Sequence, residues 1–155
     1  MYNAFPAITS LIPHRPPMVM LDRVLGVTDE SLRAEVTITA QSVFFDENEQ
    51  AVGAWLGIEF MAQTIAAFEG FQANTRGEAV KVGFLLGTRR YETHCAGFGI
   101  GSVLQVEAHR ILEHENGLAA FECRITDVNQ QLLASATVTV FKPDNVHQFL
   151  EGANV

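Results

Sequence analysis

Glu59 is the side chain whose surroundings in the sequence best suit it for proton transfer. It lies in GAWLGIEFMAQTIAAFEGF (residues 53–71), which contains no other ionisable group before Glu69. Apolar residues recur at helical spacing on nearly all sides of this stretch, a pattern typical of a buried helix. Burial disfavours the charged form of a carboxyl group, so a buried Glu59 could act as a general acid or base. The structural alternative, equally supported, is a half-exposed carboxylate or one bonded to a neighbouring backbone amide.

Two other polar side chains could act together with Glu59. Gln63 follows one helical turn later on the same face, where it could orient the carboxylate or bond to a backbone group. His14 lies in PHRPP (residues 13–17), whose prolines restrict the backbone, and it is our first candidate for a general base. The alternative for His14, which we favour, is that His14 and Arg15 lock the N-terminal segment to the sheet.

Backbone amides at the start of the helix are candidates for binding a carbonyl oxygen. We expect the helix to begin near residue 52, which places unpaired amides at Gly53 and Ala54, at the positive end of the helix dipole. The alternative role of Gly53, and of Gly57, is close packing of the helix against the sheet. Weaker candidates for a base are His94 and the acidic residues of the preceding loop, Asp46, Glu47 and Glu49.

Aromatic and basic residues could bind the rest of a substrate or its carrier. Five aromatic residues could line an apolar pocket, although each alone is more commonly a core residue. They are Phe44, Phe45, Trp55, Phe84 and Phe98. One local cluster of basic residues could dock an acidic partner, with a solvated face as the alternative. Its members are Arg76, Lys81, Arg89 and Arg90.

Composition and charge restrict the class of protein. The 155 residues are 48% hydrophobic and 18% charged, which indicates one folded domain over residues 1–155 with a core over about 11–143. The net charge of -8 argues against nucleic-acid binding, and no apolar run is long enough to span a membrane. The N-terminus lacks the basic start of a secretory signal, so we expect a cytoplasmic protein. Because Cys95, Cys123 and the histidines lack metal-ligand spacing, we expect no metal and no other cofactor.

The elements that must position these residues follow an α+β order. A short helical turn (residues 7–12) and two strands (18–27 and 32–38) precede one long helix (52–74), which Arg76 and Gly77 close. Glycines at 97, 99 and 101 indicate a flexible connection. The later strands are predicted over residues 80–93, 102–113, 118–128 and 132–141, with Asn116-Gly117 as a hairpin turn. This order predicts an antiparallel sheet wrapped around one long central helix, whose remaining edges and bare face indicate an oligomer.

Three motifs in this layout resemble the 3-hydroxyacyl-ACP dehydratases, which have the hotdog fold. LIPHRPPMVMLDRVL (11–25) is similar to that family's proline-histidine-arginine-proline segment and the strand that follows it. GIEFMAQTIAA (57–67) resembles its helix motif, with a catalytic acid before Ala-Gln, and GIGSVLQVEAHRI (99–111) resembles a later strand. PHRPPM, WxGIEFMAQ and GFLLGTR together are most similar to the small ApeP-like dehydratase subunits of aryl-polyene gene clusters.

The resemblance implies a hotdog domain that acts on 3-hydroxyacyl thioesters of acyl carrier protein, in fatty acid or polyene biosynthesis, with Glu59 as catalytic acid. It also implies a homodimer, or a heterodimer with another hotdog subunit. The family's Gly-His-Phe-Pro segment, whose histidine is the base, has no histidine counterpart in SVFFDENEQAVGAW (42–55). Two alternatives therefore stay open: an acyl-ACP or acyl-CoA thioesterase, and a non-catalytic subunit of a heteromeric dehydratase.

Overall fold

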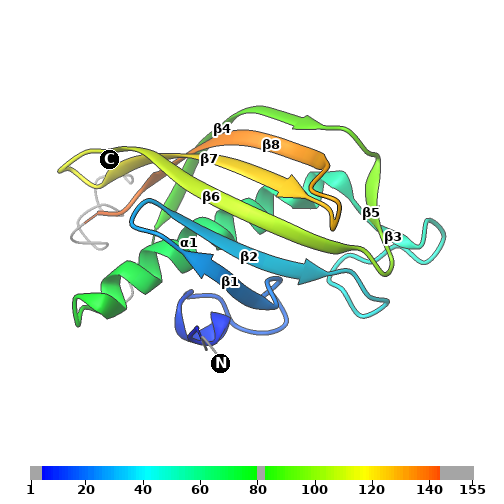
Figure 1. Cartoon of the computed structure of the whole chain (residues 1–155), viewed down its shortest axis with the longest axis horizontal. Coiled ribbons are helices and arrows are strands. Elements are labelled where there is room, and N and C mark those ends of the chain that lie inside the picture. The colour runs from blue at the N-terminus through cyan, green and yellow to red at the C-terminus, as the bar shows by residue number, and fades with distance from the viewer. Residues whose placement is uncertain (1–4, 80–82, 144–155) are drawn as a thin grey trace, which may run out of the picture.

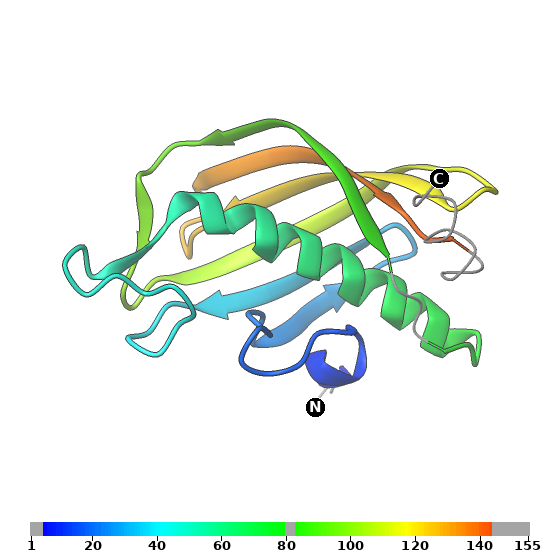
Figure 2. The same ribbon diagram turned by 180° about the vertical axis from the view of Figure 1, so that it is seen from behind.

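One long helix lies against a curved antiparallel sheet in this α+β protein (Figure 1). The computed structural model describes residues 5–79 and 83–143, with the side chain of Phe84 excepted. Helix α1 spans Gly57–Thr75 and crosses the concave side of the sheet, as the view from behind shows (Figure 2). The predicted layout, a sheet wrapped around one central helix, is confirmed.

The main sheet has six strands in the order β1-β2-β6-β7-β8-β4, and every neighbouring pair is antiparallel. Their bounds are Arg23–Val27 (β1), Ser31–Thr37 (β2), Phe84–Thr93 (β4), Val103–Glu113 (β6), Leu118–Thr126 (β7) and Leu132–Phe141 (β8). A separate two-stranded sheet joins β3 (Ala51–Gly53) to β5 (Gly97–Gly99). Within residues 5–79 and 83–143, strands β1 and β4 are therefore the two edges of the main sheet.

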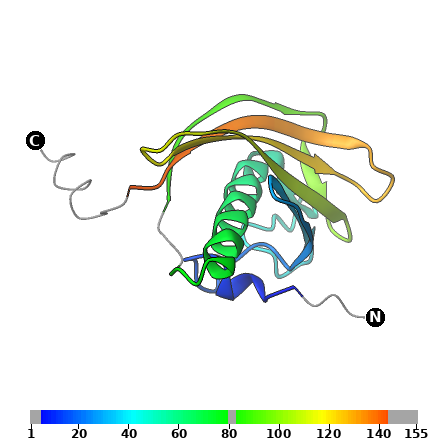
Figure 3. The same ribbon diagram turned by 60° about the vertical axis from the view of Figure 1, so that its left-hand side comes forward.

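The core forms between the helix and the inward-facing residues of the sheet. Burial alternates along β6, β7 and β8, as the period of two in their sequences predicts. Ala108, Cys123 and Ala136 are buried neighbours in register across these three strands. Their small side chains leave room for large helix residues, of which Phe60 and Phe68 are almost fully buried. Figure 3 shows the sheet curving over the helix on one side only.

The helix begins later than the sequence predicts. The prediction placed its start at residue 52, but residues 51–53 form β3 and Ala54–Leu56 form a 3₁₀ turn before α1. Strand β3 pairs with β5, which occupies the segment predicted as a flexible glycine connection, so that prediction is also wrong. The predicted end is confirmed, because Arg76 caps the helix and Gly77 has a φ of 69°.

The first predicted strand is also shorter than expected. Only Arg23–Val27 pair as β1, whereas residues 18–22 run beside the helix outside any strand. The predicted turn at 7–12 contains a 3₁₀ turn over Ile8–Ser10. The predicted strand over residues 80–93 is described from residue 84 onward, and residues 80–82 lie outside the described part of the chain.

Gly70 lets the N-terminal segment approach the helix closely. A Cβ atom added at Gly70 would lie 1.8 Å from the carbonyl oxygen of Leu11, a backbone atom that no side-chain rotation can move away. Leu11 is fully buried, so this contact fixes the segment that leads to residue 14 against the helix.

We predict that Gly70→Ala lowers the free energy of unfolding by about 1–3 kcal/mol, because the added methyl group overpacks this contact. Urea denaturation followed by circular dichroism measures the change. Gly87→Ala is the matched control, since an added Cβ there meets nothing within 4 Å. Equal stability of the two variants would contradict the close approach.

Candidate active site

Glu59 lies in the first turn of α1, on a side of the helix that the sheet does not cover. Its side chain is 37% exposed, so this chain alone covers the carboxylate only in part. The expectation of a fully buried helix is therefore wrong at this position, and the half-exposed alternative is confirmed. The reason is that the sheet curves over one side of the helix, which leaves residues such as Glu59, Ala62 and Ala66 only partly covered.

Gln63 holds the carboxylate and the N-terminal segment together. The amide nitrogen Nε2 donates to Glu59 Oε1 at 3.0 Å and to the carbonyl oxygen of Met18 at 2.8 Å. The amide oxygen Oε1 accepts the backbone N–H of Met20 at 2.9 Å. Gln63 is fully buried, so these protein groups replace the hydrogen bonds that water would supply. Gln63 therefore has both roles that the sequence allowed: it bonds to the Glu59 carboxylate and to backbone groups.

The structure brings His14 to Glu59, although the two residues lie far apart in the sequence. Nε2 of His14 is 3.6 Å from Oε1 of Glu59, and the His14 side chain is 30% exposed. Nδ1 of His14 is buried and has no hydrogen-bond partner among the described residues. Arg15 Nη1 donates to the carbonyl oxygen of His14 at 2.9 Å, which fixes the turn locally. The segment is thus locked to the helix and also delivers an imidazole to the carboxylate.

The sequence predicts unpaired backbone amides before the helix, but the amide of Ala54 has a partner. The N–H of Ala54 donates to the carbonyl oxygen of Ala96 at 3.2 Å, so it is not free to bind a substrate oxygen. Gly53 belongs to β3, where it lies opposite Gly97, and it precedes the α-helix by a full 3₁₀ turn. The expectation that the Ala54 amide is unpaired is wrong, and the role of Gly53 and Ala54 toward a thioester oxygen stays a prediction.

Tyr91 packs against the start of the helix. Its hydroxyl donates to the carbonyl oxygen of Ala54, and burial raises the pKa of Tyr91 to about 12. A Cβ atom added at Gly57 would lie 2.2 Å from that hydroxyl oxygen and 3.0 Å from Cδ1 of Ile125. Gly57 is therefore needed for close packing, which was the structural alternative for this glycine.

The aromatic residues predicted to line one pocket are distributed over different sites. Phe98 is a core residue that packs against Phe60 at 6.0 Å between ring centroids. Phe44 and Trp55 are 57% and 60% exposed and form an edge-to-face pair at 5.4 Å. Phe45 lines a separate surface hollow of about 750 Å³ with them. The side chain of Phe84 lies outside the described part of the structure, so its predicted role is untested.

The predicted basic cluster does not form as one patch. Arg76 caps the C-terminal end of α1. Arg89 and Arg90 are exposed near the end of β4, beside Tyr91, which contacts the opposite end of the helix. Lys81 lies outside the described residues. Only Arg89 and Arg90 therefore stay close together at the end of the helix that carries Glu59.

Glu59 and His14 open into a cavity of about 180 Å³ that runs beside the helix. Ala62, Ile65 and Ala66 line its floor, and Leu85 of the edge strand β4 lines its wall. Ligand sites in proteins commonly measure about 300–1,000 Å³, so this cavity is small for an acyl thioester. The chain therefore supplies one side of a site that is open toward the edge of the sheet.

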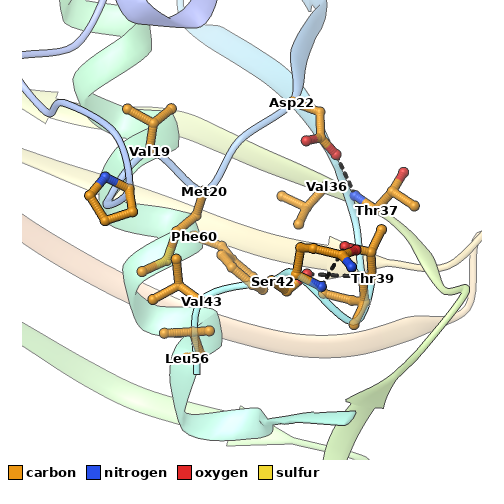
Figure 4. A pocket seen from close by; sticks show the side chains of 13 residues that line it. Val19, Met20, Asp22, Val36, Thr37, Thr39, Ser42, Val43, Leu56 and Phe60 are labelled. Atoms are coloured by element: carbon orange, nitrogen blue, oxygen red, sulfur yellow. Dashed lines mark hydrogen bonds between the residues drawn. The ribbon is translucent and has the colours of Figure 1, made fainter. Parts of the chain in front are cut away.

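A second cavity of about 380 Å³, lined by both apolar and polar side chains, lies between the helix start and the end of β2 (Figure 4). Val19, Met20, Val43, Leu56 and Phe60 point toward it, and Thr39 and Ser42 are on its rim. The two cavities have no lining residue in common. Sequence reasoning missed this site because its walls come from three separate segments. The apolar Val43 within the polar loop was the available signal.

The remaining ionisable groups contribute little to this site. Cys95 and Cys123 are free thiols, and burial raises the pKa of both. Within residues 5–79 and 83–143, no group of three or more His, Cys, Asp or Glu side chains could hold a metal ion. In the same part of the chain, no helix combines the length and apolar character needed to cross a membrane.

Comparison with known proteins reveals relatives over nearly the whole chain. The ApeP-like family, described as ApeP dehydratase, matches residues 6–151. A 3-hydroxyacyl-[acyl-carrier-protein] dehydratase FabZ from Pseudothermotoga lettingae is 28% identical over 134 residues, which cover 86% of this chain and 91% of that protein. A FabZ from Streptococcus thermophilus is 31% identical over 77 residues, 48% of this chain and 55% of that protein.

Solved structures give a matching result for the fold. A chain of the dehydratase heterocomplex ApeI:P from Xenorhabdus doucetiae superposes with a TM-score of 0.90 and 28% identity, covering 98% of this chain and 100% of that one. The E. coli PaaI protein from the phenylacetic acid degradation operon superposes with a TM-score of 0.58 at 13% identity, covering 77% and 81%. The second match shows the fold alone. Together they confirm the predicted hotdog fold.

We predict that Gln63→Leu lowers the free energy of unfolding by about 2–4 kcal/mol, because the backbone groups of Met18 and Met20 lose their partners. Thermal and urea denaturation measure this loss. Gln72→Leu on the same helix is the control, since Gln72 is half-exposed and should tolerate the change. If both variants are equally stable, the Gln63 bonds do not hold the N-terminal segment.

Proposed function

Because the chain belongs to the ApeP-like dehydratase family, we propose that it takes part in removing water from 3-hydroxyacyl thioesters carried by acyl carrier protein. The observation that carries this proposal is the Glu59–His14 pair, 3.6 Å apart and opening into one cavity. The FabZ relatives are named as dehydratases of this substrate class. A thioesterase structure that also superposes is only 10% identical, so this match supports the fold and is no argument for hydrolysis.

The proposed reaction needs two proton transfers, and the pair offers two groups. His14 accepts the proton from C2 of the substrate, and Glu59 protonates the hydroxyl group that leaves C3. The missing loop histidine is replaced by one from the N-terminal segment of the same chain. Gln63 positions the Glu59 carboxylate beside the imidazole by its hydrogen bond at 3.0 Å. In this proposal the acidic loop residues supply no base.

We further propose that a second hotdog subunit completes the site. The Glu59 side chain is 37% exposed in this chain, so a second subunit could cover it and exclude water from the site. Strand β4 is an edge of the described sheet, and its Leu85 and Leu86 are 49% and 55% exposed. Since Leu85 also lines the cavity, a subunit that pairs with β4 would close the site in the same step.

Two observations favour a complex with a second subunit, and the first of them favours a different subunit. The related ApeI:P structure is a heterocomplex of dehydratase subunits. The cavity of about 180 Å³ also leaves the isolated chain with one wall of a site. The runner-up function is accordingly a non-catalytic subunit that supports a catalytic partner. Arg89 and Arg90, exposed at the Glu59 end of the molecule, are the proposed docking residues for the acidic carrier protein.

We expect the chain, with a partner dehydratase subunit, to convert 3-hydroxyacyl-ACP to a product lighter by one water, detected by mass spectrometry. Glu59→Gln and His14→Asn should each reduce the rate by about 10²–10⁴-fold, because each removes one proton-transfer group. Glu78→Gln, an exposed change beyond the helix, serves as the control.

Size-exclusion chromatography of each mixture separates catalysis from assembly. Variants that still form the complex but lose water removal support the catalytic role. Full activity of an assembled Glu59→Gln complex would assign this chain to the non-catalytic role. Release of free thiol in place of water loss would identify a thioesterase.

A further inference from the structure

Two large aromatic side chains lie exposed before the start of the helix, outside the cavity at Glu59. Phe44 and Trp55 are 57% and 60% exposed, and their rings form the edge-to-face pair described above. Both line the surface hollow of about 750 Å³, which shares no lining residue with the Glu59 cavity. An exposed patch of apolar surface commonly marks a site of contact with another molecule. More than half of each of these two residues is available for such a contact.

The backbone holds Phe44 in a conformation that is unfavourable for an aromatic residue. Its φ is 63°, in the left-handed region that residues with a Cβ atom rarely adopt. The N–H of Phe45 donates to the carbonyl oxygen of Ser42 at 3.0 Å, which closes a turn with Phe44 at its third position. Gly or Asn normally occupies a turn position with positive φ. The exposed ring is thus kept in place against the preference of its own backbone.

Three carboxylates surround the aromatic pair. Asp46, Glu47 and Glu49 are exposed and line the same hollow. Among the described residues, none of the three has an ion-pair partner. The Asp46 carboxylate orders the loop, because it accepts the backbone N–H groups of Asn48 and Glu49 at 2.8 and 3.2 Å. The carboxylates of Glu47 and Glu49 hold no part of the described chain in place, so their charge is available to a partner.

Exposed aromatic rings beside unpaired carboxylates favour a cation as the occupant. The face of an aromatic ring attracts positive charge, and tryptophan does so most strongly. A guanidinium group can stack on a ring and also donate two parallel hydrogen bonds to a carboxylate, whereas an ammonium group acts as a point charge. Arginine and tryptophan are both enriched among the interface residues that contribute most to affinity. The chemistry of the hollow therefore fits an arginine side chain.

The openness of the hollow and its place beside β4 indicate a protein as the source of this arginine. Small ligands are normally buried over most of their surface, but both rings of this hollow are more than half exposed. Ala96 and Gly97 line the hollow and follow β4 after a short connection, and β4 is the edge that we propose to pair with a second subunit (Figure 1). Acyl carrier protein is acidic, so these carboxylates would repel it.

We propose that the hollow at Phe44 and Trp55 is a docking site for an arginine side chain of the second subunit. This inference rests on the second subunit of the proposed function, but it does not depend on the dehydration step. In the complex, the guanidinium group stacks on the Trp55 ring and pairs with the carboxylates of Glu47 and Glu49. The acidic loop then serves assembly rather than proton transfer.

Trp55 is the only tryptophan of the chain, so a probe on this residue reports on the hollow directly. Labelling the chain with fluorotryptophan gives a single fluorine NMR signal, whatever the partner contains. The partner dehydratase subunit of the turnover assay is then added, and isothermal titration calorimetry measures its Kd in parallel. We expect the Trp55 signal to shift as the complex forms.

Reversing the charge of the hollow should weaken the complex. Glu47→Lys with Glu49→Lys should raise the Kd for the partner by about 10-fold or more at ~50 mM salt, and the effect should shrink at ~1 M salt, where charges are screened. Phe44→Asn should also raise the Kd, since it removes the ring at a φ that Asn accepts. Glu78→Lys with Glu115→Lys is the matched control, because both residues are exposed and lie outside the hollow.

Phenylglyoxal modifies arginine side chains and so identifies the occupant. At concentrations that saturate both complexes, we expect a partner arginine to be protected by the unaltered chain and modified in the complex with the Glu47→Lys/Glu49→Lys variant. A Trp55 signal that does not shift, equal Kd values for this variant and the control, or no protected arginine would each overturn the inference. Absence of any complex would overturn it together with the proposed second subunit. Docking as described, without water loss, would support the inference and contradict the proposed dehydration.

Discussion

One buried amide determines where the candidate site can form. Gln63 meets the carbonyl oxygen of Met18 and the N–H of Met20, two backbone groups that a neighbouring β-strand would otherwise bind. The side chain thus makes the two hydrogen bonds that a neighbouring strand would make, and it holds an extended segment beside a helix. Its second Nε2 proton is left for Glu59, so the same amide sets the position of the segment and of the carboxylate. His14 reaches Glu59 because it lies on the chain that this amide retains.

The parts of the fold that depend on local pattern could be predicted from the sequence. The alternation in residues 132–141 gave both ends of β8, and Gly77 marked the end of the helix. The start of the helix could not be predicted in this way, because apolar residues at 51–53 fit a helix or a strand equally. Their pairing with residues 97–99 decides the outcome, and that pairing is a contact between distant segments. Residues 18–22 have strand composition, but the backbone groups of Met18 and Met20 bond to the Gln63 side chain in place of a strand.

The same distinction separates the site residues that were found from those that were missed. Glu59 and Gln63 are one helical turn apart, so their contact follows from sequence spacing. His14 was identified by its proline-rich surroundings, although its distance from Glu59 required the fold. Lys142, which lines the Glu59 cavity and pairs with Glu69, was not identified at all, because nothing near it in the sequence indicates that contact. Exposure of Glu59 depends on how far the sheet curves around the helix, which residue periodicity does not specify.

The register between β2 and β6 has a consequence for biosynthesis. It joins Ser31 to His109 and Thr37 to Val103, so the N-terminal hairpin has no sheet to enter until most of the chain has left the ribosome. Contacts between such distant segments form late and slowly. The helix emerges before β6, β7 and β8, three of the strands that pack against it, so its apolar side chains stay exposed until those strands follow. The segments that carry His14 and Glu59 both leave the ribosome before strands β6, β7 and β8, so this candidate pair can meet before the main sheet is complete.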